Sequence, residues 1–276
     1  MTDVANSEAR LGSAVRSAGG RSASIFAARA AFLAVILLAW QGAVDSGLAN
    51  AAFISTPASV ARSLWLLFRD GEILPDLGTT VLEITIAFAL SVVFGIASAV
   101  VLDRNDWLNR IVSPFLTAFN SMPRIALGPL FILWFGIGIA SKVVLAFSLG
   151  YFIMLLSTLG GLKNVDRDLL LMSRLFGASE FRLFRHVRFP WALPGIFAGL
   201  KLTLIYCSAG AVIGEMIAAK SGLGVLLQSF SGRFDVAGVL ALILIVALLV
   251  MALTSVMDLV ERRLLAWSKG STDVPG

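Results

Sequence analysis

Long apolar runs separated by short polar stretches dominate the pattern of this chain. Six runs are long enough to cross the hydrocarbon core of a bilayer, which takes about 20 apolar residues. They lack the alternating polar and apolar positions of membrane β-barrel strands. We therefore predict an all-α, polytopic membrane protein with six transmembrane helices, at 25–44, 79–102, 111–137, 142–162, 195–219 and 236–260.

The composition supports one membrane domain. Of the 276 residues, 58% are hydrophobic and 14% are charged, and the mean hydropathy is +0.90. A soluble domain has about 45–50% apolar and about 25% charged residues. We predict a disordered tail at 1–24, a transmembrane domain at 25–265 and a second tail at 266–276.

The basic residues indicate which way the chain is oriented. Cytoplasmic loops of membrane proteins are rich in Lys and Arg. With the N-terminus inside, the inside segments hold fifteen Lys and Arg and the outside segments hold five, Lys142 among them. Both termini are therefore expected in the cytoplasm, and the lipid bilayer of the inner membrane is the expected environment. No basic stripe is interleaved with aromatics, so nucleic-acid binding is not expected.

Few residues are suited to catalysis or metal binding. His186 and Cys207 are the only histidine and cysteine, and metal sites or catalytic sets need several convergent groups. No such set stands out, so we expect neither an enzyme nor a metal site.

The connection before the second span has a pattern of its own. Pro57 follows Thr56, a combination that favours a helix start. Leu64, Leu67 and Phe68 share one face of the helix predicted over 57–70. We expect this short helix to lie on the outer surface.

The connection over 163–194 is too long for a structureless loop in a compact domain. Asp166 and Asp168 suit the start of a first helix, and Gly177 is expected to end it. The pattern predicts two short amphipathic helices joined at this glycine.

Ser179 is expected to cap the second helix, and Pro190 and Pro194 to stop it before the next span. Arginine-rich amphipathic helices rest on lipid headgroups or dock to a partner protein. Periodicity alone favours neither role.

This loop resembles the coupling loop of permease subunits in binding-protein-dependent ABC importers. Gly177 is followed by nine residues and then by Val187, Arg188, Phe189 and Pro190, which is the spacing of that family. Leu171, Met172 and Ser173 stand where the family pattern has Glu-Ala-Ala.

The resemblance covers about residues 55–265 and is strongest to the nitrate, sulfonate, taurine and bicarbonate branch. Many members of that branch have an arginine where this chain has Glu83. The matching stretches are 56–60, 122–130, 135–138, 141–142, 194–201, 214–216 and 222–224.

The family implies a type I ABC importer permease-like fold and a membrane-spanning subunit that forms the pathway for a small solute. An anion such as a sulfonate or nitrate is the expected substrate, and small aromatic or vitamin-precursor solutes remain possible. The implied partners are cytoplasmic ABC ATPase subunits, an extracytoplasmic solute-binding protein and a second permease subunit in a homodimer.

This chain has no G-x-x-x-x-G-K-[ST] phosphate loop, so ATP is expected on the ATPase and no cofactor on this chain. The alternative is a secondary transporter or channel that works without ATP. The resemblance places ATPase docking in the loop 164–190, on Asp168, Leu171, Met172, Ser173, Leu175, Phe176, Gly177, Ala178, Ser179, Phe181, Val187 and Pro190.

Four charged residues fall inside predicted spans, namely Glu83, Arg124, Lys201 and Glu215. A charge at the bilayer centre costs about 2.5–3.5 kcal/mol or more, so such groups usually face a cavity or each other. One hypothesis is that Glu83, Arg124 and Glu215 meet around the translocation pathway. The other is that both carboxylates are interfacial and that Arg124 snorkels or bonds backbone. Lys201 is expected to snorkel to the inner surface.

Proline and glycine also mark the spans. Pro123 is expected either to kink the third span and widen the pathway or to serve packing alone. Gly195/Gly199 and Gly210/Gly214 are G-x-x-x-G pairs on the fifth span. Because this spacing lets helices approach closely, we expect packing within the subunit rather than a dimer contact.

Overall fold

The structure is a computed structural model that describes residues 2–48, 50–71 and 73–265, so the predicted tail 266–276 lies outside the described residues. Every regular element in the described ranges is a helix, as predicted. The elements are α1 (Thr2–Asp45), α2 (Ala51–Ile54), α3 (Pro57–Arg69), α4 (Ile73–Arg104), α5 (Asp106–Ser121), the 3₁₀ turn η1 (Arg124–Leu127), α6 (Gly128–Phe135), α7 (Ile139–Lys163), α8 (Arg167–Leu175), α9 (Glu180–Leu183), the π-helical turn η2 (Phe184–Arg188), α10 (Phe189–Ala218), α11 (Leu223–Gly232) and α12 (Val236–Leu264).

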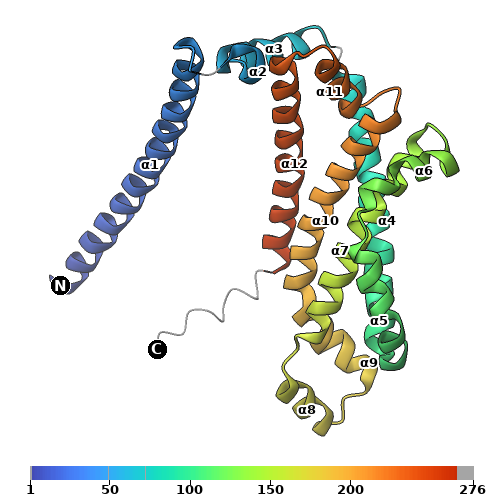
Figure 1. Cartoon of the computed structure of the whole chain (residues 1–276). Coiled ribbons are helices and arrows are strands. Elements are labelled where there is room, and N and C mark those ends of the chain that lie inside the picture. Colours follow the sequence, from blue (N-terminus) through green and yellow to red (C-terminus); the bar gives the residue numbers. More distant parts are fainter. Residues whose placement is uncertain (1, 49, 72, 266–276) are drawn as a thin grey trace.

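Four long helices form the bundle, and α7 is its centre. α7 packs against both α4 and α10, and α12 closes the bundle against α10, α11 and α3. In Figure 1 the short helices α8 and α9 lie at one end of the bundle, here called the α8 end, and α3 and α11 lie at the other, the α11 end. The predicted spans at 79–102, 142–162, 195–219 and 236–260 therefore correspond to α4, α7, α10 and α12.

The third predicted span, 111–137, is not one helix. α5 and the segment Arg124–Phe135 meet at an angle of 81°. The cause is the Met122–Pro123 step, because the residue before a proline is driven out of the helical region. Met122 has ψ 140° and Pro123 has ψ 81°. The expected kink at Pro123 is therefore a full break.

The first span is confirmed in place, but its helix starts earlier than predicted. α1 begins at Thr2, whereas we expected a disordered segment over 1–24. This segment holds five Ala and three Arg, which are strong helix formers, and also five Ser and three Gly, which are weaker ones. A span that is already helical removes the cost of nucleation, so helix extends into the preceding residues.

The predicted surface helix is present as α3. The Thr56 side chain accepts a hydrogen bond from the Ser59 N–H at 3.1 Å, which confirms the predicted cap. Leu64 and Leu67 pack on a buried cluster made of Ile73, Leu223, Leu242 and Ile245. Phe68 departs from the predicted shared face, because half of its surface remains exposed.

The glycine pairs of α10 all face α7. A Cβ on Gly210 would lie 2.6 Å from the Ala146 Cα, and one on Gly214 would lie 3.3 Å from the Lys142 Cα. Gly195 and Gly199 meet Gly161 and Ser157 in the same way. The expectation of packing within the subunit is confirmed.

The close approach of α10 to α7 predicts that one added methyl group destabilises the protein at Gly210 but not at Gly160. Gly210→Ala should destabilise the protein by about 1–3 kcal/mol, because the Ala146 backbone cannot move away cheaply. Gly160→Ala on α7 is the matched control, since nothing lies within 4 Å of its Cβ. Thermal unfolding of the purified protein in detergent measures both, and equal melting temperatures for the two variants would contradict the close contact.

Candidate functional site

The loop between α7 and α10 begins with the first predicted helix, α8. The Asp166 carboxylate accepts a hydrogen bond from the Asp168 N–H at 2.8 Å, which confirms the predicted start. After α8 the chain reverses at Gly177, whose φ of +78° is a conformation that glycine adopts without strain. The Ala178 N–H reaches back to the Ser173 carbonyl at 3.1 Å and closes this corner.

The second helix, α9, is capped by Ser179 as predicted. It does not stop at the two prolines, however, because Glu180–Ala218 continues as one helical segment through η2. In the π-helical turn the Phe189 N–H bonds to the Phe184 carbonyl five residues back. Pro190 follows Phe189 directly, where the regular i to i−4 ladder is already interrupted, so its missing N–H costs less than in a regular helix interior. Pro194 lies within α10.

Large apolar side chains are exposed on and around α8. Leu175 and Phe176 are 85% and 89% exposed, and Leu171, Met172 and Phe181 are also exposed. α8 itself lies against α9, whose Leu183 is fully buried. The predicted docking residues Leu171, Met172, Leu175, Phe176 and Phe181 are therefore apolar side chains that the described residues leave exposed.

A hollow of about 440 Å³ lies between α8 and the α9–η2 segment. Four predicted docking residues line it, together with Arg182, Leu183 and His186: Ser173, Phe176, Ala178 and Val187. Gly177 and Ser179 form the exposed corner between the helices, Asp168 is exposed in the first turn of α8, and Pro190 is half-buried at the start of α10. The structure thus brings most of the predicted docking set onto one end of the bundle.

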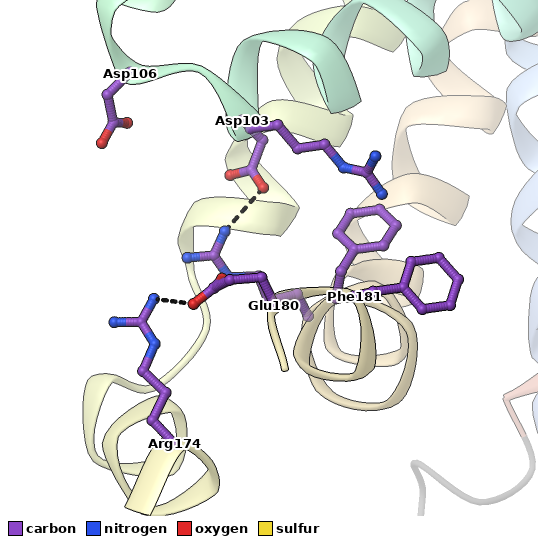
Figure 2. A pocket seen from close by; sticks show the side chains of 8 residues that line it. Asp103, Asp106, Arg174, Glu180 and Phe181 are labelled. Carbon is purple, nitrogen blue, oxygen red and sulfur yellow. Dashed lines mark hydrogen bonds and ion pairs between the residues drawn. The ribbon is translucent and has the colours of Figure 1, made fainter. Parts of the chain in front are cut away.

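A second pocket of about 450 Å³ separates this loop from the ends of α4 and α5 (Figure 2). Arg188 pairs with Asp103 at 3.1 Å across it, and Arg174 pairs with Glu180 at 3.1 Å near its rim. The guanidinium of Arg104 lies 4.7 Å from the ring centroid of Phe184. Sequence analysis did not single out Asp103, because its partner is 85 residues away.

At the α11 end, Glu83 on α4 pairs with Lys142 on α7 at 2.7 Å, and both side chains are buried. Lys142, counted above among the outside residues, stands at the first position of the predicted span 142–162. It lies within α7, since that helix begins at Ile139. The sequence feature that could have predicted this pair is Glu83 itself. A carboxylate alone in an apolar span needs a cation close to it.

Glu215 holds the start of α11. Thr80 Oγ1 donates to one carboxylate oxygen at 2.7 Å, and the Gly224 N–H donates to the other at 2.7 Å. The Leu223 N–H bonds to Thr80 Oγ1, and the Gly222 N–H bonds to Asp76 Oδ1. Three N–H groups at this helix start are therefore satisfied by side chains of α4 and α10.

The predicted meeting of Glu83, Arg124 and Glu215 is half correct. Glu83 and Glu215 are both buried at the α11 end, where Glu83 pairs with Lys142 and Lys142 lies against Gly214, the neighbour of Glu215. Arg124 instead donates to the carbonyls of Ser148 and Asn120, at 3.1 Å each, and lies 4.3 Å from the ring centroid of Phe152. The alternative, an arginine that bonds backbone, describes Arg124 better, because the break at Pro123 places it against the middle of α7.

Lys201 also has a definite role in packing. It pairs with Asp258 at 2.5 Å and with Glu261, so it joins α10 to α12. The expected snorkelling describes only part of its environment, since its side chain is 31% exposed.

The sequence matches the family described as "Binding-protein-dependent transport system inner membrane component" over residues 91–266. That match includes the bent pair, the loop and the last two spans. The chain belongs to this family. It is a multi-pass permease subunit of the ABC importer type.

Three relatives illustrate the range of the family. The permease is 31% identical to the riboflavin transport system permease RibX of Chloroflexus aurantiacus, covering 85% of this chain and 88% of that protein. It is 31% identical to the formylaminopyrimidine transport permease ThiX of Halalkalibacterium halodurans, covering 86% and 94%. It is 30% identical to the putative aliphatic sulfonates permease SsuC of Escherichia coli, covering 84% and 89%.

Solved structures share the fold of the permease. A chain of the inward-facing MetNI methionine ABC transporter superposes with a TM-score of 0.61 at 23% identity, covering 72% of this chain and 96% of that one. An amino acid ABC transporter solved with histidines gives 0.59 at 16% identity, covering 72% and 97%. The predicted type I importer permease fold is confirmed.

The buried pair of the permease predicts a non-additive effect on stability. Glu83→Leu alone should lower the free energy of unfolding by about 3–5 kcal/mol, because it leaves the Lys142 ammonium buried without its partner. Glu83→Leu with Lys142→Leu should cost less than Glu83→Leu alone, since Glu215 keeps its own donors.

Unfolding in mixed micelles measures these values. Arg69→Ala is the control, because it breaks an exposed pair with Asp70 that is worth at most about 1 kcal/mol. A double variant less stable than the single variant would contradict the pairing.

Proposed function

We propose that this permease subunit couples ATP hydrolysis on separate cytoplasmic ATPase subunits to import of a small solute, and that the α8 end is the docking surface. The observation that carries the proposal is the exposed apolar face of α8, the helix that ends just before the corner at Gly177. Exposed apolar side chains on a short, rigidly capped helix are suited to bury themselves in a groove of a partner protein.

The proposed contact combines apolar and charged parts. Leu171, Met172, Leu175 and Phe176 provide the apolar area, and the hollow beside them can accept partner side chains. Leu171 stands where the family pattern has its Glu, and Ser173 stands at the second Ala, where its hydroxyl bonds the Leu169 carbonyl at 2.8 Å. Docking therefore rests on shape and apolar surface rather than on an acidic residue at positions 171–173.

The orientation follows from this assignment. The α8 end is proposed to face the cytoplasm, together with both termini, because the basic loop residues gather there. The α11 end, with α3 and α11, is then proposed to receive the solute-binding protein. Its helices are held firmly by the Asp76, Thr80 and Glu215 contacts.

We assign the pathway to the bent pair and the buried charges. Pro123 breaks the helix, and Arg124 fixes the bend to the middle of α7. Glu83 and Glu215 keep the α11 end of α4 and α10 together. A second copy of the subunit is proposed to complete the pathway as a homodimer, whose mass in detergent tests the stoichiometry.

The solute is proposed to be a small anion such as a sulfonate or nitrate, with support from the likeness to the sulfonate permease SsuC. A heteroaromatic vitamin or precursor is the second candidate, because RibX and ThiX are named for riboflavin and formylaminopyrimidine. Calorimetric titration of the partner binding protein with an alkanesulfonate, nitrate, riboflavin and formylaminopyrimidine separates these candidates. We expect binding of an anion, and binding of riboflavin or formylaminopyrimidine alone would replace it.

The docking proposal predicts that a charge introduced on the exposed face of α8 weakens binding of the ATPase. Leu175→Glu should reduce co-purification of the ATPase at least about tenfold, because a carboxylate would be desolvated in an apolar contact. Phe234→Glu, at a similarly exposed phenylalanine on the α11 end, is the matched control and should leave the ATPase bound. Equal losses from both variants, or from neither, would contradict docking at α8. Import by the purified permease without any ATPase would overturn the proposed function.

A further inference from the structure

α8 touches the rest of the permease through few contacts. Its neighbour is α9, which is only four residues long and leads through η2 into α10. A π-helical turn is a weak point in a helix and is often found at functional sites. We call the segment formed by α9 and η2 the joint. A force on α8 would bend this joint unless another contact holds it.

The joint is held by an ion pair to α4. Arg188, the last residue of η2, donates from Nη1 to the Asp103 carboxylate at 3.1 Å. The two side chains are 24% and 6% exposed, so water screens this pair far less than the surface pair between Arg174 and Glu180. Both residues line the pocket between the loop and the end of α4, where Figure 2 labels Asp103.

A second contact joins the same two elements. Arg104, the last residue of α4, lies over the ring of Phe184, the first residue of η2. Phe184 in turn packs on the buried cluster of Met154, Leu162, Ala192 and Ile196. The first and last residues of the π-helical turn are therefore both tied to the last two residues of α4.

The ion pair between Arg188 and Asp103 does not use every hydrogen-bond donor of the arginine. The Nε of Arg188 is buried and has no hydrogen-bond partner, and the pair uses a single nitrogen instead of the two that an arginine can offer. Such a pair can change its geometry while the opposite charges stay together. The pocket of about 450 Å³ beside it gives the arginine room to do so.

We infer that Asp103 and Arg188 are positioning residues that make α4 follow the docking helix. When the ATPase displaces α8, the ion pair moves the end of α4 with the joint instead of letting η2 bend alone. The other end of α4 carries Asp76 and Thr80, which hold the start of α11. α4 thus links the ATPase end to the α11 end as a single helix of 32 residues. This inference rests on the proposed function.

The test uses the complete transporter in proteoliposomes, with its ATPase and binding protein. The solute is the one that the binding protein binds in the calorimetric titration described above. The number of solute molecules imported per ATP hydrolysed is compared between the wild type, Asp103→Asn and Arg188→Gln. Each single change should lower this ratio on the order of tenfold, while ATPase co-purification stays close to wild type. Because the pair is largely buried, each single change should also lower the melting temperature, so the ratio is compared at a temperature at which all variants remain folded. Asp103→Glu keeps the charge and should retain most of the ratio.

Two further variants make the result specific. The charge-reversed pair Asp103→Arg with Arg188→Asp should restore much of the ratio lost in either single reversal. Asp106→Asn removes a carboxylate from the same pocket and should keep the wild-type ratio, because Asp106 makes no ion pair among the described residues.

The outcomes separate the two proposals. If the wild type imports solute without ATP, the proposed function fails. If the wild type is ATP-driven and the single changes keep its ratio, the inference fails alone. Loss of ATPase binding in the single changes, or no recovery in the charge-reversed pair, also overturns the positioning role.

Discussion

The close approach of α7 and α10 is the constraint on which the rest of the permease depends. Within a bilayer, helices gain little from leaving the lipid, so packing and polar contacts must hold them together. Small residues along α10 let its backbone reach that of α7, and Gly214 lies directly against Lys142. This contact fixes where Lys142 can reach, and the ion pair with Glu83 then brings α4 to the same place. The bundle is therefore assembled around one seam.

The two ends of the bundle are organised by different polar contacts. At the α11 end, the buried Glu215 carboxylate and the half-buried Asp76 carboxylate accept N–H groups from the start of α11, which leaves this end little freedom. At the α8 end, charged pairs border a pocket and tie a π-helical turn to α4, while α8 remains outside with its apolar face uncovered. A rigid end and an adjustable end are what a subunit needs if a partner pushes on one side and the solute enters from the other.

Features that depend on neighbouring residues were predicted well. The apolar runs gave five of the spans, Thr56, Asp166 and Ser179 were identified as caps, and Gly177 as the corner of the loop. Each of these rests on local backbone preferences or on burial in lipid.

The errors arose where a residue's local preference was overridden by the structure around it. Pro190 was expected to end a helix, yet it follows a π-helical turn that already interrupts the regular hydrogen-bond ladder, and the helix continues through it. Pro123 was expected either to kink the third span or to serve packing alone, and the helix breaks there instead.

The sequence by itself determined that this protein spans a membrane, which family it resembles and which segment carries the paired short helices. Hydrophobic length, capping residues and motif spacing are recorded along the chain, so they need no knowledge of the fold. Only the tertiary structure decided the partners of the charged residues: Glu83 with Lys142, Asp103 with Arg188, and Arg124 with backbone carbonyls of α7. The physical reason is that a buried charge is satisfied by whatever group lies within about 3 Å, and helix packing brings together groups that are 59 to 85 residues apart for the two ion pairs.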